Sequence, residues 1–103
     1  MKIDSLATFN NINYIDFGEK ILVFKFGGDW CVPCMELNKN LEKIENILVY
    51  EISIDEPDFE SYLIDNKIYK IPHCICKYKN KKSQFKGVKT VDELQEFFDD
   101  MRK

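Results

Sequence analysis

The sequence Trp-Cys-Val-Pro-Cys at residues 30–34 decides the fold, because it places two closely spaced cysteines between two regular elements. Before it, residues 21–26 (Ile-Leu-Val-Phe-Lys-Phe) form an apolar run of strand length and β-favouring composition. After it, apolar residues recur at helical spacing with polar residues between them, at Leu37, Leu41 and Ile44. The pattern predicts a strand, a short turn and a helix over about residues 34–44, with both cysteines at the helix N-terminus.

Both cysteines are candidate redox residues because of this position. The unpaired backbone N–H groups and the positive end of the dipole at a helix N-terminus stabilise a thiolate, and a thiolate is the attacking species in disulfide exchange. Pro33 suits the first helical turn, where no N–H donor is needed. The sequence therefore predicts Cys31 as a nucleophile, and the alternative at this point is half of a structural metal site.

The composition predicts one domain over residues 1–103. The chain is 45% hydrophobic and carries 15 Lys+Arg against 18 Asp+Glu, a net charge of −3, which argues against a nucleic acid or an anionic membrane as the main partner. Residues 1–11 lack the apolar run of a signal peptide, and no stretch approaches membrane-spanning length. We therefore expect a cytoplasmic protein that binds neither nucleic acid nor membrane.

The other two cysteines, Cys74 and Cys76, share one face of a later predicted strand, and His73 lies on its other face. One interpretation is a pair of inert core thiols, because free cysteine is among the most buried residue types. The other is a metal or iron–sulfur site built from Cys31, Cys34 and His73, with Cys74 as a further candidate ligand. The reducing compartment that we expect for cysteines without a secretion signal is compatible with both.

The rest of the chain alternates further strands and helices. The elements that we expect are a helix starting near residue 5, a strand at 47–54, a short helix after 55–58, strands at 73–78 and 84–86 separated by a polar turn at 80–82, and a last helix opened by a capping box at 90–93. A β-α-β unit followed by a β-β-α unit predicts an α/β domain with a central mixed sheet.

Residues 26–34 (Phe-Gly-Gly-Asp-Trp-Cys-Val-Pro-Cys) resemble the active-site segment of the thioredoxin family. Ile71-Pro72-His73 is similar to the loop that carries a cis-proline opposite the cysteines in that family, and Gly87 and the last helix align as well. The resemblance covers residues 21–98. It implies the thioredoxin fold, a three-layer α/β/α arrangement around a central mixed sheet, and a cis Ile71–Pro72 bond.

The family's chemistry, carried over to this sequence, implies a protein disulfide reductase without a bound cofactor or metal. Cys31 would form a mixed disulfide with a client protein, and Cys34 would resolve it by closing a Cys31–Cys34 redox disulfide. Pro33 favours a reductant. The implied partners are client protein disulfides and an upstream thiol or flavoprotein reductase, and we expect a monomer.

The resemblance also implies a docking surface for the client, in which the backbone of Ile71 pairs with the client chain. Its residues would be Trp30, Val32, Pro33, Ile71, Pro72, His73 and Gly87. We expect His73 either to contact the client, to tune the Cys31 thiolate, or to be simply exposed. The alternative from a different class is a non-catalytic thioredoxin-fold binding module that uses this surface without redox chemistry.

At two positions the sequence carries a charge opposite to the one that the thioredoxin family carries. Counting back from Trp30, Lys25 stands where thioredoxins carry a buried aspartate below the second cysteine, and Glu51 stands where they carry its lysine partner. The resemblance therefore predicts an ion pair with swapped ends, in which Lys25 favours the Cys34 thiolate. The alternative is that either side chain reaches the surface, since a lone buried charge is costly.

Overall fold

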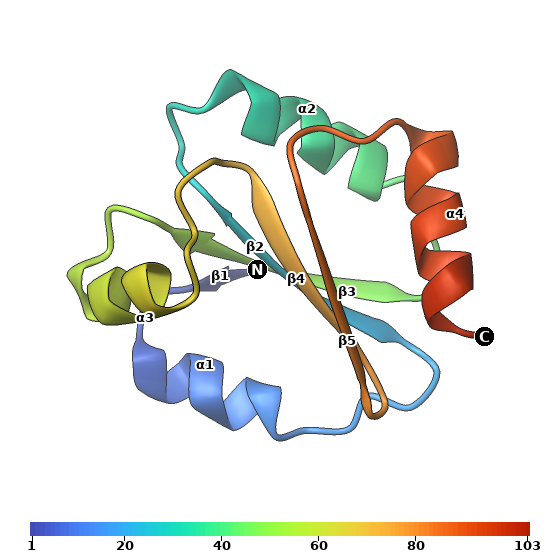
Figure 1. The fold of residues 1–103 in the computed structure, drawn as a ribbon, viewed down its shortest axis with the longest axis horizontal. Helices are drawn as coiled ribbons and strands as arrows, with labels where there is room; N and C mark the ends of the chain where they lie inside the picture. The colour runs from blue at the N-terminus through green and yellow to red at the C-terminus, as the bar shows by residue number, and fades with distance from the viewer.

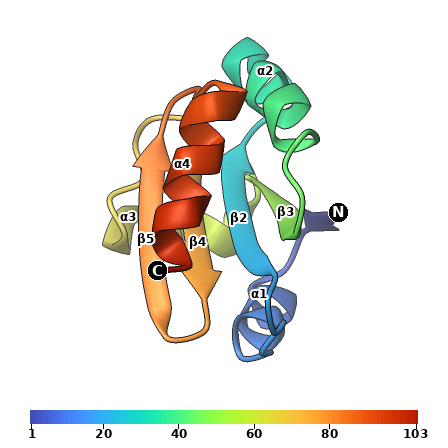
Figure 2. The same ribbon diagram turned by 90° about the vertical axis from the view of Figure 1, so that its right-hand side faces the viewer.

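The computed structural model describes residues 1–103 and contains one five-stranded mixed sheet between two helical layers (Figures 1 and 2). The strand order is β1-β3-β2-β4-β5, with bounds β1 (Lys2–Ile3), β2 (Ile21–Gly27), β3 (Ile47–Ser53), β4 (His73–Tyr78) and β5 (Lys81–Lys86). The helices are α1 (Leu6–Asn13), α2 (Val32–Leu41), α3 (Glu60–Asp65), preceded by the 3₁₀ turn η1 (Pro57–Phe59), and α4 (Val91–Met101). The predicted α/β/α layering is confirmed.

The central strand β2 is buried along its whole length, which explains its nearly continuous apolar sequence. It pairs in parallel with β3 and antiparallel with β4. Alternate residues enter two separate cores: Ile21 and Val23 pack under α2 and α4, whereas Leu22, Phe24 and Phe26 pack against α1 and α3. The one charged residue of the strand, Lys25, therefore falls on the α2 side.

The two cores lie on opposite faces of the sheet, as Figure 1 shows, with α2 and α4 covering one face and α1 and α3 the other. The α1/α3 core is rich in aromatic contacts, among them Phe9 with Phe24 at 4.6 Å and Phe9 with Phe59 at 5.7 Å between ring centroids. Edge-to-face and offset aromatic pairs at such distances stabilise a core beyond the area they bury. None of the helices combines the length and apolarity needed to cross a membrane.

Helix boundaries follow local capping. The Ser5 side chain accepts a hydrogen bond from the Thr8 backbone at the start of α1, and the predicted Thr90/Glu93 capping box opens α4. Helix α2 begins at Val32 and ends at Leu41, so it lies two to three residues earlier than the predicted 34–44. The reason is that Cys31 acts as the N-cap and Pro33 fits the first turn.

Two further details differ from the sequence-based expectations. Strand β1 was not predicted, because two residues carry no periodicity; it is held by parallel pairing with β3. The predicted turn at 80–82 is wrong: β5 already begins at Lys81, and the hairpin turns at Lys79 and Asn80. Lys79 takes the positive φ of 54° that such a tight turn requires.

Candidate active site

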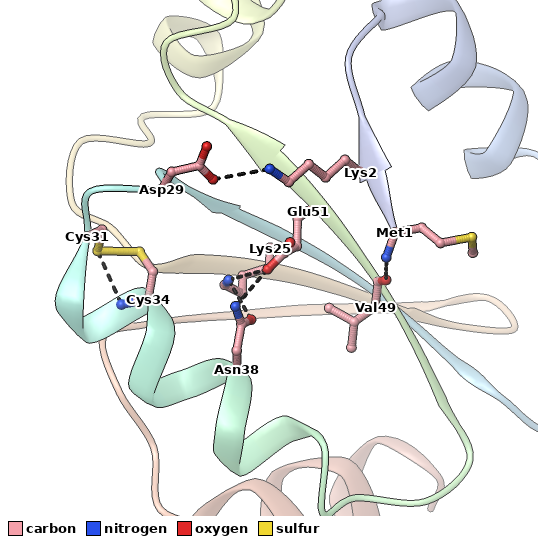
Figure 3. Close-up of polar contacts among 9 residues, drawn as sticks. All are labelled: Met1, Lys2, Lys25, Asp29, Cys31, Cys34, Asn38, Val49 and Glu51. Atoms are coloured by element: carbon pink, nitrogen blue, oxygen red, sulfur yellow. Dashed lines mark hydrogen bonds and ion pairs between the residues drawn. A yellow bond between two sulfur atoms is a disulfide. The ribbon is translucent and has the colours of Figure 1, made fainter.

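Cys31 and Cys34 form a disulfide at the N-terminus of α2 (Figure 3). Cys31 Sγ, at the N-cap, also accepts a hydrogen bond from the Cys34 backbone N–H at 3.2 Å. A donor aimed at the sulfur, together with the helix dipole, stabilises a thiolate there when the disulfide is reduced. Both cysteines are largely buried in the disulfide form, with Cys31 5% and Cys34 2% exposed.

A glycine at the end of β2 makes room for Cys34. A Cβ atom on Gly27 would lie 2.8 Å from Cys34 Sγ, closer than real Cβ atoms approach a neighbour. Gly28, next along the chain, has the same constraint toward Trp30, whose ring would lie 2.8 Å from a Cβ. Gly27 is therefore required by the packing of the buried Cys34 sulfur, whereas at Gly28 the exposed Trp30 side chain would have to move.

The predicted docking surface is present in part. Trp30 is 62% exposed and donates its indole N–H to Asp55 at 2.9 Å, and Val32 is 71% exposed. The Ile71–Pro72 peptide bond is cis, as the resemblance implied. Ile71 is half-buried, and no backbone hydrogen bond engages its N–H or C=O.

The remaining members of that surface are placed as follows. Pro33 is exposed, Gly87 is half-buried, and Pro72 is buried beneath them. The Gly87 N–H donates to the Pro72 carbonyl at 2.8 Å, and this bond links the segment between β5 and α4 to the cis-proline loop. Gly87 has a φ of 78°, in the left-handed region where glycine is favoured, so this link depends on that residue type.

The expectation that His73 is exposed is wrong. Its side chain is 1% exposed, its Nε2 lies 2.8 Å from Gln84 Oε1, and its Nδ1 has no partner. His73 is paired with Phe26 in the sheet, so it shares the α1/α3 face and turns away from α2, at whose N-terminus the cysteines lie. Its burial contradicts the expected exposure, and its orientation gives no support to a direct contact with Cys31.

Below Cys34, Lys25 and Glu51 form the ion pair that the sequence predicted (Figure 3). Lys25 Nζ lies 2.9 Å from Glu51 Oε1, and the side chains are 4% and 32% exposed. Asn38 of α2 joins them: its Oδ1 accepts from Lys25 Nζ at 2.6 Å and its Nδ2 donates to Glu51 Oε1 at 2.8 Å. Sequence reasoning missed Asn38, although its position four residues after Cys34 places both on one face of the helix.

Both members of the ion pair have a partner for their charge. Burial by itself raises the pKa of Glu51, but hydrogen bonds from Lys25 and Asn38 and the positive charge of Lys25 outweigh it and lower the pKa below its ordinary value of 4.5. Glu51 is therefore a carboxylate at neutral pH and a weaker base than an ordinary glutamate. A buried charge whose partners are in place is tolerated, whereas removal of one partner is costly.

A cavity of about 270 Å³ lies beside this network. Its lining includes Lys25, Cys34, Asn38 and Glu51, together with Gly27 at the end of β2. Lys2 and Asp29, which also line it, form an exposed ion pair at 3.2 Å. The cavity thus connects the second cysteine, but not Cys31, to the buried ammonium.

Cys74 and Cys76 are core thiols. Both are fully buried, and burial raises the pKa of Cys74 to about 12 and that of Cys76 well above its ordinary value. Thiols that stay protonated are poor nucleophiles and poor metal ligands. Nowhere does the structure gather three or more His, Cys, Asp or Glu side chains in positions to hold a metal ion.

Comparison with known proteins gives a consistent result. The family model described as Thioredoxin matches residues 3–100. The mitochondrial thioredoxin-2 of Schizosaccharomyces pombe is 29% identical over 73 residues, a match that covers 69% of this chain and only 55% of the relative, little more than half its length.

Solved structures support the same fold. Thioredoxin O1 from Arabidopsis thaliana in the oxidised state superposes with a TM-score of 0.77 at 20% identity, covering 100% of this chain and 97% of that one. The germline-specific thioredoxin Deadhead from Drosophila melanogaster superposes with a TM-score of 0.75 at 19% identity, covering 98% of each chain. These likenesses confirm the predicted fold class.

Proposed function

The chain belongs to the thioredoxin family, and on that premise we propose that it is a protein disulfide reductase that acts through the Cys31/Cys34 dithiol. In kind it is a thiol–disulfide oxidoreductase. The observation that carries the proposal is the Cys31–Cys34 disulfide at the N-terminus of α2, with Cys31 Sγ accepting the Cys34 N–H. This geometry favours the thiolate that disulfide exchange requires.

The proposed reaction has two exchange steps. The Cys31 thiolate attacks one sulfur of a client disulfide, forming a Cys31–client bond and releasing the other client sulfur as a thiolate. Cys34, as a thiolate, then attacks Cys31 Sγ, closing the Cys31–Cys34 bond and releasing the second client sulfur. The client gains two electrons and two protons, and the chain loses them. An upstream thiol or flavoprotein reductase restores the dithiol.

Client binding is proposed at the exposed part of the docking surface. Trp30 and Val32 offer apolar area beside the disulfide, and the backbone N–H and C=O of Ile71 have no main-chain partner. An extended client segment pairs with such free backbone groups in the manner of an added strand. Pro72 is buried and acts by holding Ile71 in place, with Gly87 bonded to its carbonyl.

Insulin reduction tests the proposal. With dithiothreitol as the donor, catalytic amounts of the chain are expected to accelerate the precipitation of reduced insulin chains, because dithiothreitol keeps regenerating the Cys31/Cys34 dithiol. The control is the same chain reduced and then alkylated, which keeps the fold but blocks the thiols. If the untreated chain accelerates precipitation no more than the alkylated chain, the non-catalytic binding module becomes the better description.

The double variant Cys74→Ala/Cys76→Ala is expected to retain this insulin activity. The two thiols are buried and held in the protonated form by their surroundings, so they take no part in exchange. Some stability is lost because two buried sulfurs are removed from the core under α2 and α4. A variant with native circular dichroism and no turnover would show that the second cysteine pair is part of the redox path.

A further inference from the structure

Asn38 is placed to act on Cys34 without touching a client. It lies on α2 one turn after Cys34, and its side-chain amide contacts one residue of β2 and one of β3 (Figure 3). The amide uses both ends, accepting from Lys25 Nζ at 2.6 Å and donating to Glu51 Oε1 at 2.8 Å. An amide that bridges the two ends of an ion pair fixes both of them.

One N–H donor of the Lys25 ammonium has no partner within the ion-pair network. A lysine ammonium has three N–H donors, and Lys25 uses two of them, on Asn38 and Glu51. The Lys25 side chain is 4% exposed, and Lys25 lines the cavity of about 270 Å³ that Cys34 also lines. The third N–H is therefore available to a group in that cavity.

We propose that Asn38 is a positioning residue for the resolving step: by tying Lys25 to Glu51, it holds the Lys25 ammonium beside Cys34, where the ammonium stabilises the Cys34 thiolate. The inference rests on the proposed reductase function. Lys25 and Cys34 line the same cavity, and an ammonium near a thiol in a partly buried site favours the thiolate form. Without Asn38, the long lysine side chain regains rotamer freedom and the ammonium is no longer fixed at the cavity.

The proton of Cys34 leaves through the cavity. Glu51 is already ionised, and because Lys25 and Asn38 lower its pKa it is a poor proton acceptor, so the Cys34 proton passes to solvent. The Cys34 thiolate then attacks Cys31 Sγ, the Cys31–client bond breaks, and the departing client thiolate takes up a proton from water.

Other charged residues face the same cavity but are less suited to this role. They come from the N-terminal segment, the β2–α2 turn and the segment after β3, and are Lys2, Asp4, Asp29 and Glu56. Three of these four are acidic and oppose a thiolate, and the cation Lys2 is 69% exposed and paired with Asp29. Lys25 is the buried cation, so its placement governs the charge of Cys34.

The test separates the two half-reactions in Asn38→Ala. The substrate is a small aromatic disulfide that releases coloured thiols. Release of the first thiol measures the attack of Cys31, and release of the second thiol measures the resolving step. The resolving step is expected to slow about tenfold, because the free energy of one hydrogen bond to a charged group corresponds to about that factor in rate. The attack of Cys31 is expected to keep its rate. Asn40→Ala is the matched control, because Asn40 lies on the same helix but takes no part in the ion pair. Its side chain donates a hydrogen bond of 2.9 Å to the Lys89 carbonyl.

A second variant guards against misfolding. Asn38→Asp keeps an acceptor for Lys25, and is expected to slow the resolving step as well because it adds a negative charge at the cavity and loses the donor to Glu51. Resolving rates within twofold of the starting protein in both variants would overturn the role of Asn38. A starting protein whose Cys31 never attacks would instead overturn the proposed function, so the two failures are distinguishable.

Discussion

Replacing Lys25 with aspartate is expected to lower the free energy of unfolding by roughly 3–5 kcal/mol, the usual range when a buried ion pair loses one partner. The substitution removes the ammonium that Glu51 and Asn38 bind at 2.9 and 2.6 Å and places a second carboxylate toward Glu51. Because Glu51 is 32% exposed, water offsets part of the repulsion, and we expect the lower half of that range. Denaturant unfolding followed by circular dichroism measures the loss.

Adding Glu51→Lys to this variant is expected to recover much of the loss. The double variant restores one positive and one negative charge across the β2–β3 register, in which Lys25 and Glu51 are direct partners. The coupling energy of the double-mutant cycle is the stability change of the double variant minus the sum of the changes in the two single variants, and contacting residues in one network give about 0.5–3 kcal/mol. A coupling below about 0.5 kcal/mol would contradict the pairing.

The exposed pair Lys2–Asp29 provides the matched control. It lies at the same cavity, 3.2 Å apart, but its side chains are 69% and 90% exposed. The corresponding cycle, Lys2→Asp with Asp29→Lys, is expected to give a coupling of about 0–1 kcal/mol, the range of surface ion pairs. The contrast between the two cycles isolates the effect of burial, because both pairs join a lysine to a carboxylate in the same part of the molecule.

The pairing of Lys25 with Glu51 could be predicted because the resemblance to the thioredoxin family places both residues at the positions of that family's ion pair, and the parallel register of β2 and β3 confirms it. Once the run at 21–26 and the run at 47–54 are aligned as neighbouring strands, the two charges fall opposite one another on the α2 side. The helix after the cysteines and the capping box at Thr90 follow from local signals. Strand β1 lacks such a signal, because two residues show no pattern and only the edge of β3 makes them a strand.

His73 and Asn38 show the two ways in which the site differs from the prediction: one side chain was misplaced and one residue was missed. His73 follows the cis-proline and was expected at the cysteines, but alternation along β4 sends its side chain to the α1/α3 face, where Gln84 binds it. No sequence motif points to Asn38, because a single asparagine in a helix is typical of a solvent-exposed face. Its role depends on two strands that meet below α2, which is a tertiary feature that no local pattern carries.

The Cys34→Ser variant is expected to accumulate a stable mixed disulfide between Cys31 and its client. The Cys31 thiolate still attacks, since its N-cap position and the backbone N–H of residue 34 remain, but a serine hydroxyl cannot displace a sulfur from a disulfide. The adduct is expected to approach one client per chain. Non-reducing electrophoresis detects it, reducing electrophoresis releases it, and mass spectrometry of the released partner identifies the client.

The other thiols of the chain cannot take over the resolving step in this variant. Cys74 and Cys76 are fully buried on β4, and burial raises the pKa of Cys74 to about 12, so neither supplies a thiolate at neutral pH. The matched control is Cys31→Ser, which leaves Cys34 alone beneath Gly27 and 2% exposed in the native disulfide; it is expected to trap nothing. Equal adducts from both variants would mean that the attacking and resolving cysteines are not distinct, and that the N-cap position does not select Cys31.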